Sequence, residues 1–378
     1  MTTYPKIIGI KAIPIEIAGK RTFAISEGQT KTHSSAIVRI ITEDSNIDGV
    51  AEIVCAPPGK PEEMQHEICG VINVILEKEL IGISAVDTVS ATQVINERVK
   101  GKVWTKGGLN VALNDLRAKA MGISCRSMFG TDVQDAKVPT IGTVIGIMEP
   151  DQMAQRAEEL VTDGFSALKI KVGKDLNSDF ERVRRVREVV GDNVSIRVDA
   201  NNHYLPQEAI MFINKIEHFN IEHVEQPISR FDIIGMSEIR GSVNVPLMTD
   251  DMVATPLDAM NVIRLGAADR VKVKVTKHGL DGAIQIVGML TAAGKRAVLG
   301  HVFETGLAAV AEAHLALLFQ TIVAPHEIGS MEPLGVADKI LMEDPYCNPG
   351  FITIPKGLGL GVNINWEQVE KYRVNGLI

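Results

Sequence analysis

Apolar and polar residues alternate along the first part of the chain, which is the pattern of half-buried β-strands. Residues 6–17 alternate in this way, and a further pair of short apolar runs flanks a turn at 44–46, as in a β-hairpin. A loop rich in Gly, Ser and Thr is predicted over residues 18–33. From about residue 61 to 129 the apolar period is helical. Strands followed by helices predict a compact α+β domain over residues 1–130.

From Val138 onward the pattern changes, because short β-rich runs now alternate with helical stretches. Eight such runs occur, namely VPTIGTVIG, ALKIKVG, VSIRVDAN, IEHVEQP, VPLMTDD, RVKVKVTK, RAVLGHVFE and TIVAPHEIG. This alternation predicts a closed parallel β/α barrel over residues 131–340. An open doubly wound sheet is the main alternative, but the GxGxxG turn expected after its first strand is missing. Residues 341–378 are predicted to return to the first domain.

Composition narrows the classes of function. The 378 residues carry a formal net charge of −8, which argues against a nucleic-acid partner. The four cysteines lie far apart without a CxxC spacing, so we expect free thiols in a reducing compartment. The N-terminus lacks the apolar block of a signal peptide, and no stretch has the length of a transmembrane segment. We therefore expect a cytoplasmic protein without a membrane partner.

Charged residues stand at the ends of five consecutive predicted strands. They are Lys171, Asp199, Glu225, Asp250 and Lys274, with separations of 28, 26, 25 and 24 residues. Each separation equals about one βα unit, so all five side chains should meet at one rim of the barrel. Active sites in this fold are built at the rim formed by the C-terminal strand ends.

Three converging carboxylates repel one another unless a cation lies among them. Capping or surface pairing would explain each acid alone, but three in register favour a metal site at Asp199, Glu225 and Asp250. Ligation by oxygen, with no cysteine nearby, favours Mg²⁺ first and Mn²⁺ second.

A lysine on either side of this metal indicates proton transfer. A proton α to a carboxylate is too weakly acidic for a base acting alone, but a cation stabilises the enediolate that its removal creates. Lys171 and Lys274, on opposite faces of a substrate, would remove a proton from one side and return it on the other.

The ordered motifs KIKVG, VDANN, VEQP, MTDD and KVTKHG resemble the mandelate racemase and muconate-lactonising family of the enolase superfamily. The resemblance covers nearly the whole chain. It implies an α/β fold with a TIM-type (β/α)7β barrel and an N-terminal α+β capping domain. It also implies Mg²⁺ dependence through the three carboxylates, with the two lysines as acid/base catalysts. Lysine on the sixth strand matches the muconate-lactonising subgroup.

Further roles follow from the resemblance, position by position. Lys169 matches the cation that neutralises the bound carboxylate, and Asn201 matches the polar residue two positions after the first ligand. Asp251 stands where the family has an acid beside the third ligand. KVTKHG aligns best with Lys274 as the catalyst, and Lys272 is the alternative.

Departures from the family pattern concern the substrate. At the end of the seventh strand Glu304 fits a family glutamate, whereas His301 is unusual there. Both are predicted to bind substrate, with Glu304 pairing a positively charged nitrogen. The eighth strand lacks the DxD sequence of dipeptide epimerases, so a dipeptide substrate is not expected. Phe23, in a loop over the barrel mouth, is a predicted pocket wall, and Trp104 is interpreted as structural.

The predicted function is racemisation or epimerisation of a small carboxylate, an amino-acid or imino-acid derivative, in a homo-oligomeric enzyme. A muconate-type cycloisomerase and a β-elimination dehydratase use the same groups and stay open as alternatives. A non-catalytic barrel that only binds ligands is the alternative from another class, but it has no need of both lysines.

Overall fold

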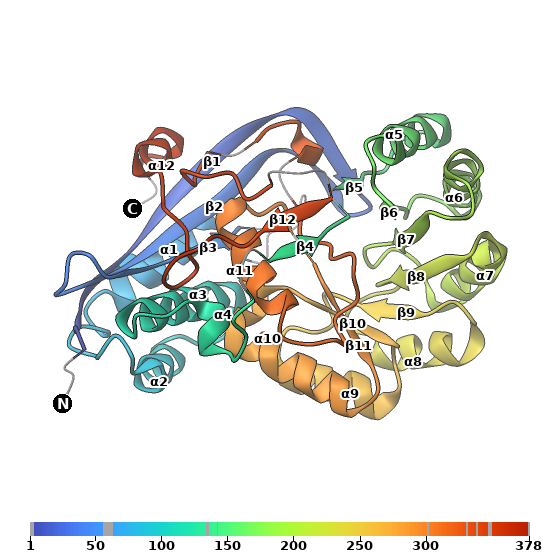
Figure 1. The fold of residues 1–378 in the computed structure, drawn as a ribbon. Coiled ribbons are helices and arrows are strands. Elements are labelled where there is room, and N and C mark those ends of the chain that lie inside the picture. Colours follow the sequence, from blue (N-terminus) through green and yellow to red (C-terminus); the bar gives the residue numbers. More distant parts are fainter. Residues whose placement is uncertain are drawn as a thin grey trace.

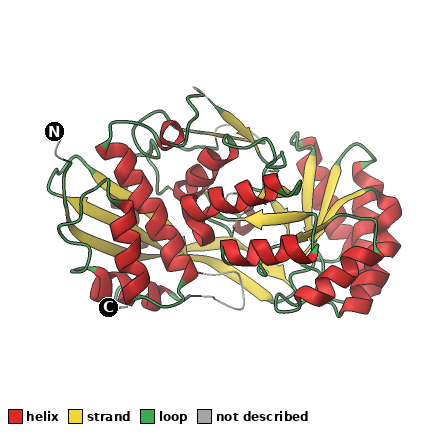
Figure 2. Cartoon of the chain, turned by 90° about the horizontal axis from the view of Figure 1, so that it is seen from below, coloured by secondary structure: helices red, strands yellow, loops and turns green. Residues whose placement is uncertain are grey.

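The computed structural model describes residues 4–376, apart from 56–62, 134–135, 142, 301, 330–331, 338 and 347–349. A layer of strands and helices stands beside a curled sheet that is surrounded by helices (Figures 1 and 2). The first part contains the N-terminal third of the chain, and the second contains most of the rest. This arrangement confirms the predicted barrel with an N-terminal α+β domain.

The N-terminal sheet is an antiparallel meander of three strands. They are β1 (Ile7–Ile25), β2 (Gly28–Thr42) and β3 (Asp48–Val54), in the order β1-β2-β3. The loop predicted over residues 18–33 is wrong, since most of it continues β1 and β2. Phe23 pairs with Thr30 and Ala24 with Gln29, so backbone pairing across a two-residue turn outweighs the loop-like composition.

Helices of the N-terminal domain occupy the region whose apolar period predicted them. They are α1 (Gln65–Gly70), the π-helix η1 (Val71–Leu76), α2 (Thr88–Arg98), α3 (Val103–Ala120) and α4 (Cys125–Met128). Leu109, Leu113 and Leu116 of α3 are buried on one face, as their spacing requires. Helix α3 packs on β3 with one side and on α10 (Val275–Ala292) of the barrel with the other.

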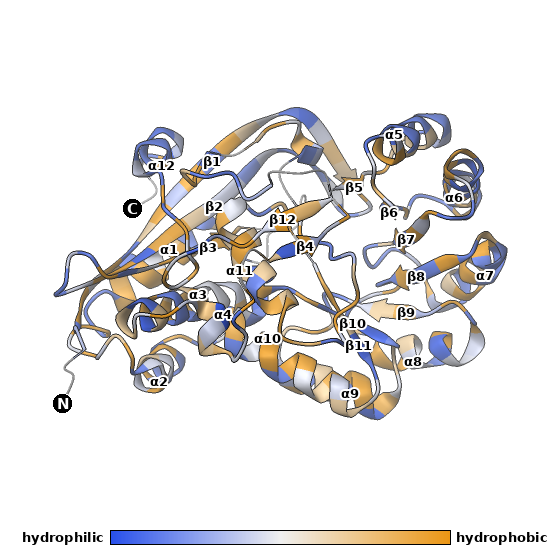
Figure 3. Cartoon of the chain, in the orientation of Figure 1, coloured by the Kyte–Doolittle hydropathy of each residue, from blue (hydrophilic) through white to orange (hydrophobic). Residues whose placement is uncertain are grey.

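Seven parallel strands form the barrel sheet, in the order β11-β10-β9-β8-β7-β6-β5. They are β5 (Val144–Ile145), β6 (Ala167–Lys171), β7 (Ser195–Asp199), β8 (Ile221–Glu225), β9 (Leu247–Thr249), β10 (Arg270–Val273) and β11 (Arg296–Leu299). The other covering helices are α5 (Pro150–Thr162), α6 (Leu176–Val190), α7 (Pro206–Ile216) with the 3₁₀ turn η2 (Glu217–Phe219), α8 (Ile233–Ser242), α9 (Pro256–Leu265) and α11 (Gly306–Ala316). Strands are mostly apolar and the outer helix faces polar (Figure 3), which agrees with a sheet covered on its outer side.

The first and eighth predicted barrel strands are less regular than expected. Residues of the first divide between β4 (Lys137–Pro139), which pairs antiparallel with β12 (Phe351–Thr353), and β5. The eighth forms isolated bridges, from Ile322 to Ala297 and from His326 to Thr140. Prolines at 139 and 325 donate no backbone hydrogen bond, which limits a regular ladder here. These bridges still link β11 to the segment before β5.

The C-terminal segment contacts the N-terminal domain. After the 3₁₀ turn η3 (Glu332–Leu334) the chain leads to α12 (Trp366–Tyr372), which lies beside β1 (Figure 1). The Val374 N–H donates to the Pro14 carbonyl, and the Arg39 guanidinium lies 4.7 Å from the centre of the Trp366 ring. Over the described residues, none of the helices combines the length and apolar character that crossing a bilayer requires.

Candidate active site

Five neighbouring strands bring the five charged residues to one rim. Lys171 ends β6, Asp199 ends β7 and Glu225 ends β8, while Asp250 and Lys274 directly follow β9 and β10. Parallel register aligns Lys171 with Asp199 and Asp199 with Glu225. All five are buried, with at most 9% of their surface exposed. The rim is therefore a convergent, largely dehydrated cluster of charge.

Ion pairs join the lysines to the carboxylates. Lys169 Nζ lies 2.9 Å from Asp199, 2.6 Å from Glu225 and 3.0 Å from Glu327. Lys171 Nζ donates to Asp199 Oδ2 at 2.7 Å and to Asn201 Oδ1 at 2.8 Å.

Lys274 stands on the other side of the site. Its Nζ donates to Asp250 Oδ2 at 2.6 Å. Strands β7, β8 and β9 separate β6, which carries Lys171, from β10, which precedes Lys274.

The carboxylates differ in how strongly they hold a proton. Burial opposes ionisation of Asp199, but Lys169 and Lys171 outweigh it and hold the pKa of Asp199 well below its ordinary value. Burial also opposes ionisation of Asp250, and Lys274 and Lys277 hold its pKa well below the ordinary value. Burial, together with the charge of Asp199, raises the pKa of Glu225 to about 7. Glu225 is thus the acid with the least compensation from cations.

Two of the three carboxylates have an oxygen that could bind a divalent cation. Glu225 Oε1 and Asp250 Oδ1 are buried and have no hydrogen-bond partner among the described residues. Such oxygens lose their hydration on burial and gain no hydrogen bond in return. A hard cation would supply the missing interaction.

Another group, His223, Glu225 and Glu327, has ligand atoms within 4.8 Å of one another. Lys272 and Arg197 already pair with Glu327 there, so this second group is a compensated ion network.

A cavity opens above the charged cluster, between the barrel and the N-terminal domain. Its polar wall contains Lys169, Lys171, Asp199, Asn201, Asp250, Asp251 and Lys274. Its apolar wall contains Phe23, Ile25, Trp104, Val144, Val302 and Phe303, and Glu27 also lines it. The rings of Phe23 and Phe303 meet edge to face, 4.5 Å between centroids.

Two of these lining positions bear on the sequence predictions. Phe23, predicted as a pocket wall, lines the cavity. Trp104, interpreted as structural, is buried in the core and also lines the cavity.

Glu304 is not among the residues that line the cavity, although its neighbours Val302 and Phe303 are. It is fully buried, and its carboxylate accepts from the Val302 N–H and hydrogen-bonds to Glu312. Burial raises the pKa of Glu304 to about 8. The predicted contact with a substrate cation finds no support in this arrangement. His301 lies outside the described residues.

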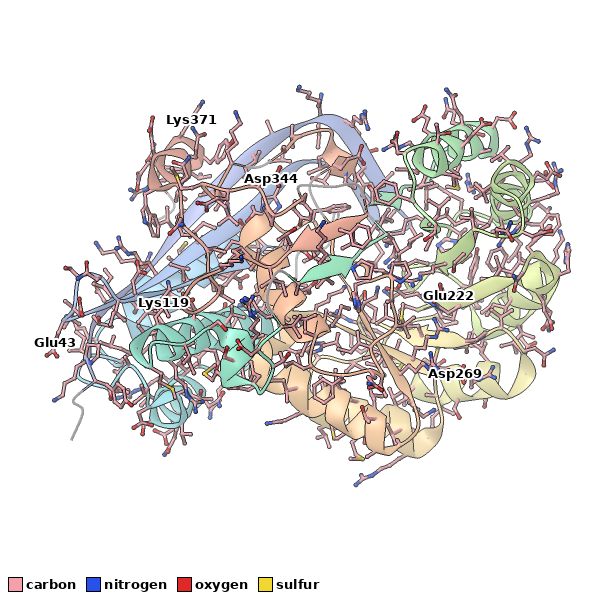
Figure 4. The ribbon with its side chains drawn as sticks, viewed as in Figure 1. Glu43, Lys119, Glu222, Asp269, Asp344 and Lys371 are labelled. Atoms are coloured by element: carbon pink, nitrogen blue, oxygen red, sulfur yellow. The ribbon has the colours of Figure 1, made fainter. Side chains whose placement is uncertain are left out.

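Several residues near the site were not predicted from the sequence. Glu327 bonds Lys169 and pairs with Lys272, beneath the cavity. Toward the other end of β8, Glu222, labelled in Figure 4, accepts from Arg197 at 2.9 Å and from Arg270 at 2.5 Å. Alternating charged residues along short strands are the signal that could have indicated this ionic floor.

Lys277, on the first turn of α10, donates to the Asp250 carbonyl at 3.1 Å and so supports a predicted ligand. Asp251 accepts from Asn202 at 3.0 Å, beside that ligand.

Family models match both parts of the chain. Residues 10–130 match the mandelate racemase/muconate lactonizing enzyme N-terminal domain, and residues 152–369 match the enolase C-terminal domain-like family. The D-Ala-D/L-Ala epimerase of Cytophaga hutchinsonii is 31% identical over 360 residues, which cover 94% of this chain and 96% of that protein.

Solved structures agree with these matches. The N-succinyl Arg/Lys racemase of Bacillus cereus has a TM-score of 0.88 at 26% identity, covering 98% of both chains. A dipeptide epimerase from Cytophaga hutchinsonii, complexed with Mg and D-Ala-L-Val, has a TM-score of 0.87 at 28% identity, again covering 98% of both chains. The chain therefore belongs to the mandelate racemase/muconate lactonizing enzyme family of the enolase superfamily, as an isomerase.

Proposed function

We propose that the enzyme racemises or epimerises an amino-acid or imino-acid derivative with a free carboxylate, by 1,1-proton transfer that depends on a divalent metal. The observation that supports this most is the pair Lys171 and Lys274, which line one cavity from two separated strands. Two bases on different sides of one carbon allow a proton to leave from one face and return on the other.

Asp199, Glu225 and Asp250 would hold the metal, with Mg²⁺ preferred and Mn²⁺ as the substitute. When bound, the cation stabilises the negative charge that develops on the substrate carboxylate as the α-proton leaves. Lys169 adds a fixed positive charge at the same pole: burial opposes its ionisation, but its three carboxylate partners hold its pKa well above the ordinary value. Lys169 therefore binds charge and does not exchange protons.

Lys274 needs a change in its ion pair before it acts as a base. Burial opposes its ionisation, but Asp250 outweighs burial and raises the pKa of Lys274 above its ordinary value. Engaging Asp250 as a metal ligand would withdraw this stabilisation and ease proton loss from Lys274. The ligand set and the base are thus coupled through one carboxylate.

The apolar wall favours a substrate with an apolar portion beyond its carboxylate. Amino-acid derivatives have this shape, and they are the substrates named for the epimerase and racemase relatives above. The similarity to dipeptide epimerases also restores dipeptides as candidate substrates, although this chain has Glu327 and Gly329 where a DxD pair was sought.

Deuterium exchange at the α-carbon tests the proposal. In D₂O with Mg²⁺, N-acyl amino acids and dipeptides of each configuration are followed by NMR. Lys171→Ala and Lys274→Ala should each reduce racemisation about 10²- to 10⁴-fold, as expected when a catalytic base is lost. Each variant should retain exchange for one enantiomer, and for opposite ones.

The exposed Lys174, three residues from Lys171, provides the control as Lys174→Ala. Wild-type exchange of both enantiomers in both catalytic variants would refute the two-base mechanism. Dependence of product formation on one lysine alone would favour cycloisomerisation or β-elimination.

A further inference from the structure

A buried carboxylate outside the cavity, that of Asp179, joins two loops of the barrel rim. Asp179 lies in the first turn of α6 and is fully buried. Its Oδ2 accepts from the N–H groups of Gly173 and Lys174, at 3.0 and 2.9 Å, and from the Tyr204 hydroxyl at 2.8 Å. The first two donors belong to the loop after β6, and Tyr204 belongs to the loop after β7. One oxygen therefore links the two loops directly.

The other oxygen of Asp179 is also occupied. Arg182, which is buried one turn further along α6, donates to Asp179 Oδ1 at 2.8 Å. The same guanidinium donates from its Nε to the Met148 carbonyl at 2.8 Å. Four donors, all of them protein groups, thus hold the carboxylate, so the fold itself fixes its position.

The two linked loops carry groups of the candidate site. Lys171 ends β6, two residues before Gly173, and its Nζ donates to Asn201 Oδ1 at 2.8 Å. Asn201 stands three residues before Tyr204 in the loop after β7. The position of the Lys171 ammonium relative to Asn201 therefore depends on how the two loops are held together, which Asp179 determines.

The loop after β7 has a backbone that needs such support. Asn201 and Asn202 both have left-handed backbone angles, with φ of 41° and 63°. Residues other than glycine keep such angles only where the surrounding structure enforces them. Tyr204 follows this turn and is held twice, because its N–H donates to the Pro227 carbonyl at 2.9 Å and its hydroxyl donates to Asp179.

We propose that Asp179 is a positioning residue for Lys171, which it holds in place through the loops after β6 and β7. The inference rests on the proposed function, because it takes Lys171 as the base that serves one face of the substrate. Lys274 follows β10, on the far side of β8 and β9 from these loops. Loss of the Asp179 carboxylate should therefore slow proton transfer at one face of the substrate and leave the other face unaffected.

Exchange of the α-proton, measured separately for each enantiomer, tests this selectivity. Asp179→Asn keeps the shape of the side chain but loses its charge and one of its acceptor oxygens. Exchange of the enantiomer that depends on Lys171 should fall about 10- to 100-fold, as a displacement of about 1 Å would cause, while the other rate stays within about twofold. Tyr204→Phe removes a single donor and should cause a smaller fall of about three- to tenfold for the same enantiomer.

Asp115→Asn is the matched control. Asp115 of α3 is also fully buried, and it accepts from the N–H groups of Val50 and Leu360 at 2.9 and 2.8 Å. Its replacement should lower the urea midpoint as Asp179→Asn does, yet leave the ratio of the two exchange rates as in wild type. A purely structural role of Asp179 would likewise lower both rates together.

Amide hydrogen exchange, followed by mass spectrometry without substrate, gives a readout that is independent of activity. Asp179→Asn and Tyr204→Phe should speed amide exchange about tenfold in residues 172–175 and 200–205, whereas Asp115→Asn should not. Unchanged protection of both loops, or an equal fall of the two enantiomers' rates in Asp179→Asn, overturns the inference. If wild type exchanges the α-proton of no substrate, the proposed function fails, whereas faster amide exchange in both loops of the variants would still support the link through Asp179.

Discussion

At the scale of single residues, the acids of this protein divide into ionised and protonated groups. Asp199 and Asp250 have lysine partners that keep them ionised. Glu304 and Glu312 instead face each other in a fully buried site, and burial raises the pKa of both. Burial removes the water that stabilises an ionised carboxylate. The carboxyl group therefore stays protonated unless a cation or several hydrogen-bond donors replace that water. The Glu304–Glu312 pair is therefore a neutral, hydrogen-bonded pair at low pH. At high pH its ionisation destabilises the folded state.

This pair predicts how stability depends on pH. The pKa of Glu304 is about 8 in the folded protein against an ordinary value of 4.5, so the folded state binds more protons between these values. Stability then falls as pH rises from about 5 to 9. Glu304→Gln, which cannot ionise, should flatten this fall, measured as the urea midpoint at pH 6 and pH 9. Parallel pH profiles for wild type and Glu304→Gln would contradict the assignment.

The sequence predicted the charged cluster because each βα unit has nearly constant length. Lys171, Asp199 and Lys274 could thus be assigned to one rim from spacing alone. Spacing did not reveal that Glu304 turns inward, since a residue just past a strand end has no fixed side. Glu27 and Trp104 were not predicted to line the cavity for a different reason. They belong to the N-terminal domain, and no local sequence pattern links them to the barrel rim.

At the scale of elements, the amino-acid composition of the β1–β2 hairpin predicts a loop, whereas its backbone pairing forms strands. Its Gly, Ser and Thr residues resemble a loop, yet both strands continue to a two-residue turn at Ser26-Glu27. Docking on the barrel explains this, because Ala24 and Ser26 gain partners there that an isolated hairpin lacks. The helices and the inner barrel strands agree with the predicted pattern because their periodicity depends on burial within the same unit.

Gly173→Ala tests the docking of this hairpin. Gly173 has φ +109°, and its added Cβ would lie 2.8 Å from Ser26 Cβ. Gly164 has a similar φ of +101° with nothing within 4 Å, so Gly164→Ala reproduces the backbone strain without the clash. Both variants should lose about 1–3 kcal/mol of stability from strain.

Only Gly173→Ala should also weaken substrate binding, with KM raised about tenfold, because it displaces the tip of this hairpin above the cavity. KM values measured with the substrate that exchanges best, beside urea midpoints, separate the two effects. Equal KM values for both glycine variants would mean that the tip does not contribute to binding.

At the scale of the whole molecule, the proposed metal site would link activity to stability. Three strand ends contribute carboxylates that repel one another, so a bound cation should stabilise the fold, and the stabilisation should grow with the logarithm of the cation concentration above its Kd. We expect Mg²⁺ at about 100 times its Kd to add about 2.7 kcal/mol, seen as a rise in Tm of several degrees. Glu225→Gln should abolish the rise, whereas Glu43→Gln, far from the site (Figure 4), should retain it. A Mg²⁺-dependent rise that persists in Glu225→Gln would exclude this ligand set.

The cavity requires both domains, since its charged wall comes from the barrel and part of its apolar wall from the N-terminal domain. Their relative position is therefore a determinant of activity. Homo-oligomerisation and a cytoplasmic location remain predictions, the first of which light scattering can test. The contact between α3 and α10 is the place where a variant tests the relative position of the domains, because α10 begins beside Lys274.

Gly107 makes this helix contact possible. A Cβ there would lie 2.6 Å from the Lys277 carbonyl and 2.7 Å from the Thr276 carbonyl, both backbone atoms that cannot rotate away. Gly107→Ala should therefore force α3 away from α10 and cost about 1–3 kcal/mol, as overpacking does. It should also lower the exchange rate, since the first turn of α10 follows Lys274 and bonds Asp250 through Lys277.

Gly288→Ala, in α10 with nothing within 4 Å, should instead gain up to about 1 kcal/mol from helix propensity and keep full exchange. Urea midpoints and α-deuterium exchange on both variants decide the matter: a stabilised, fully active Gly107→Ala would show that the domains tolerate a shift at this contact.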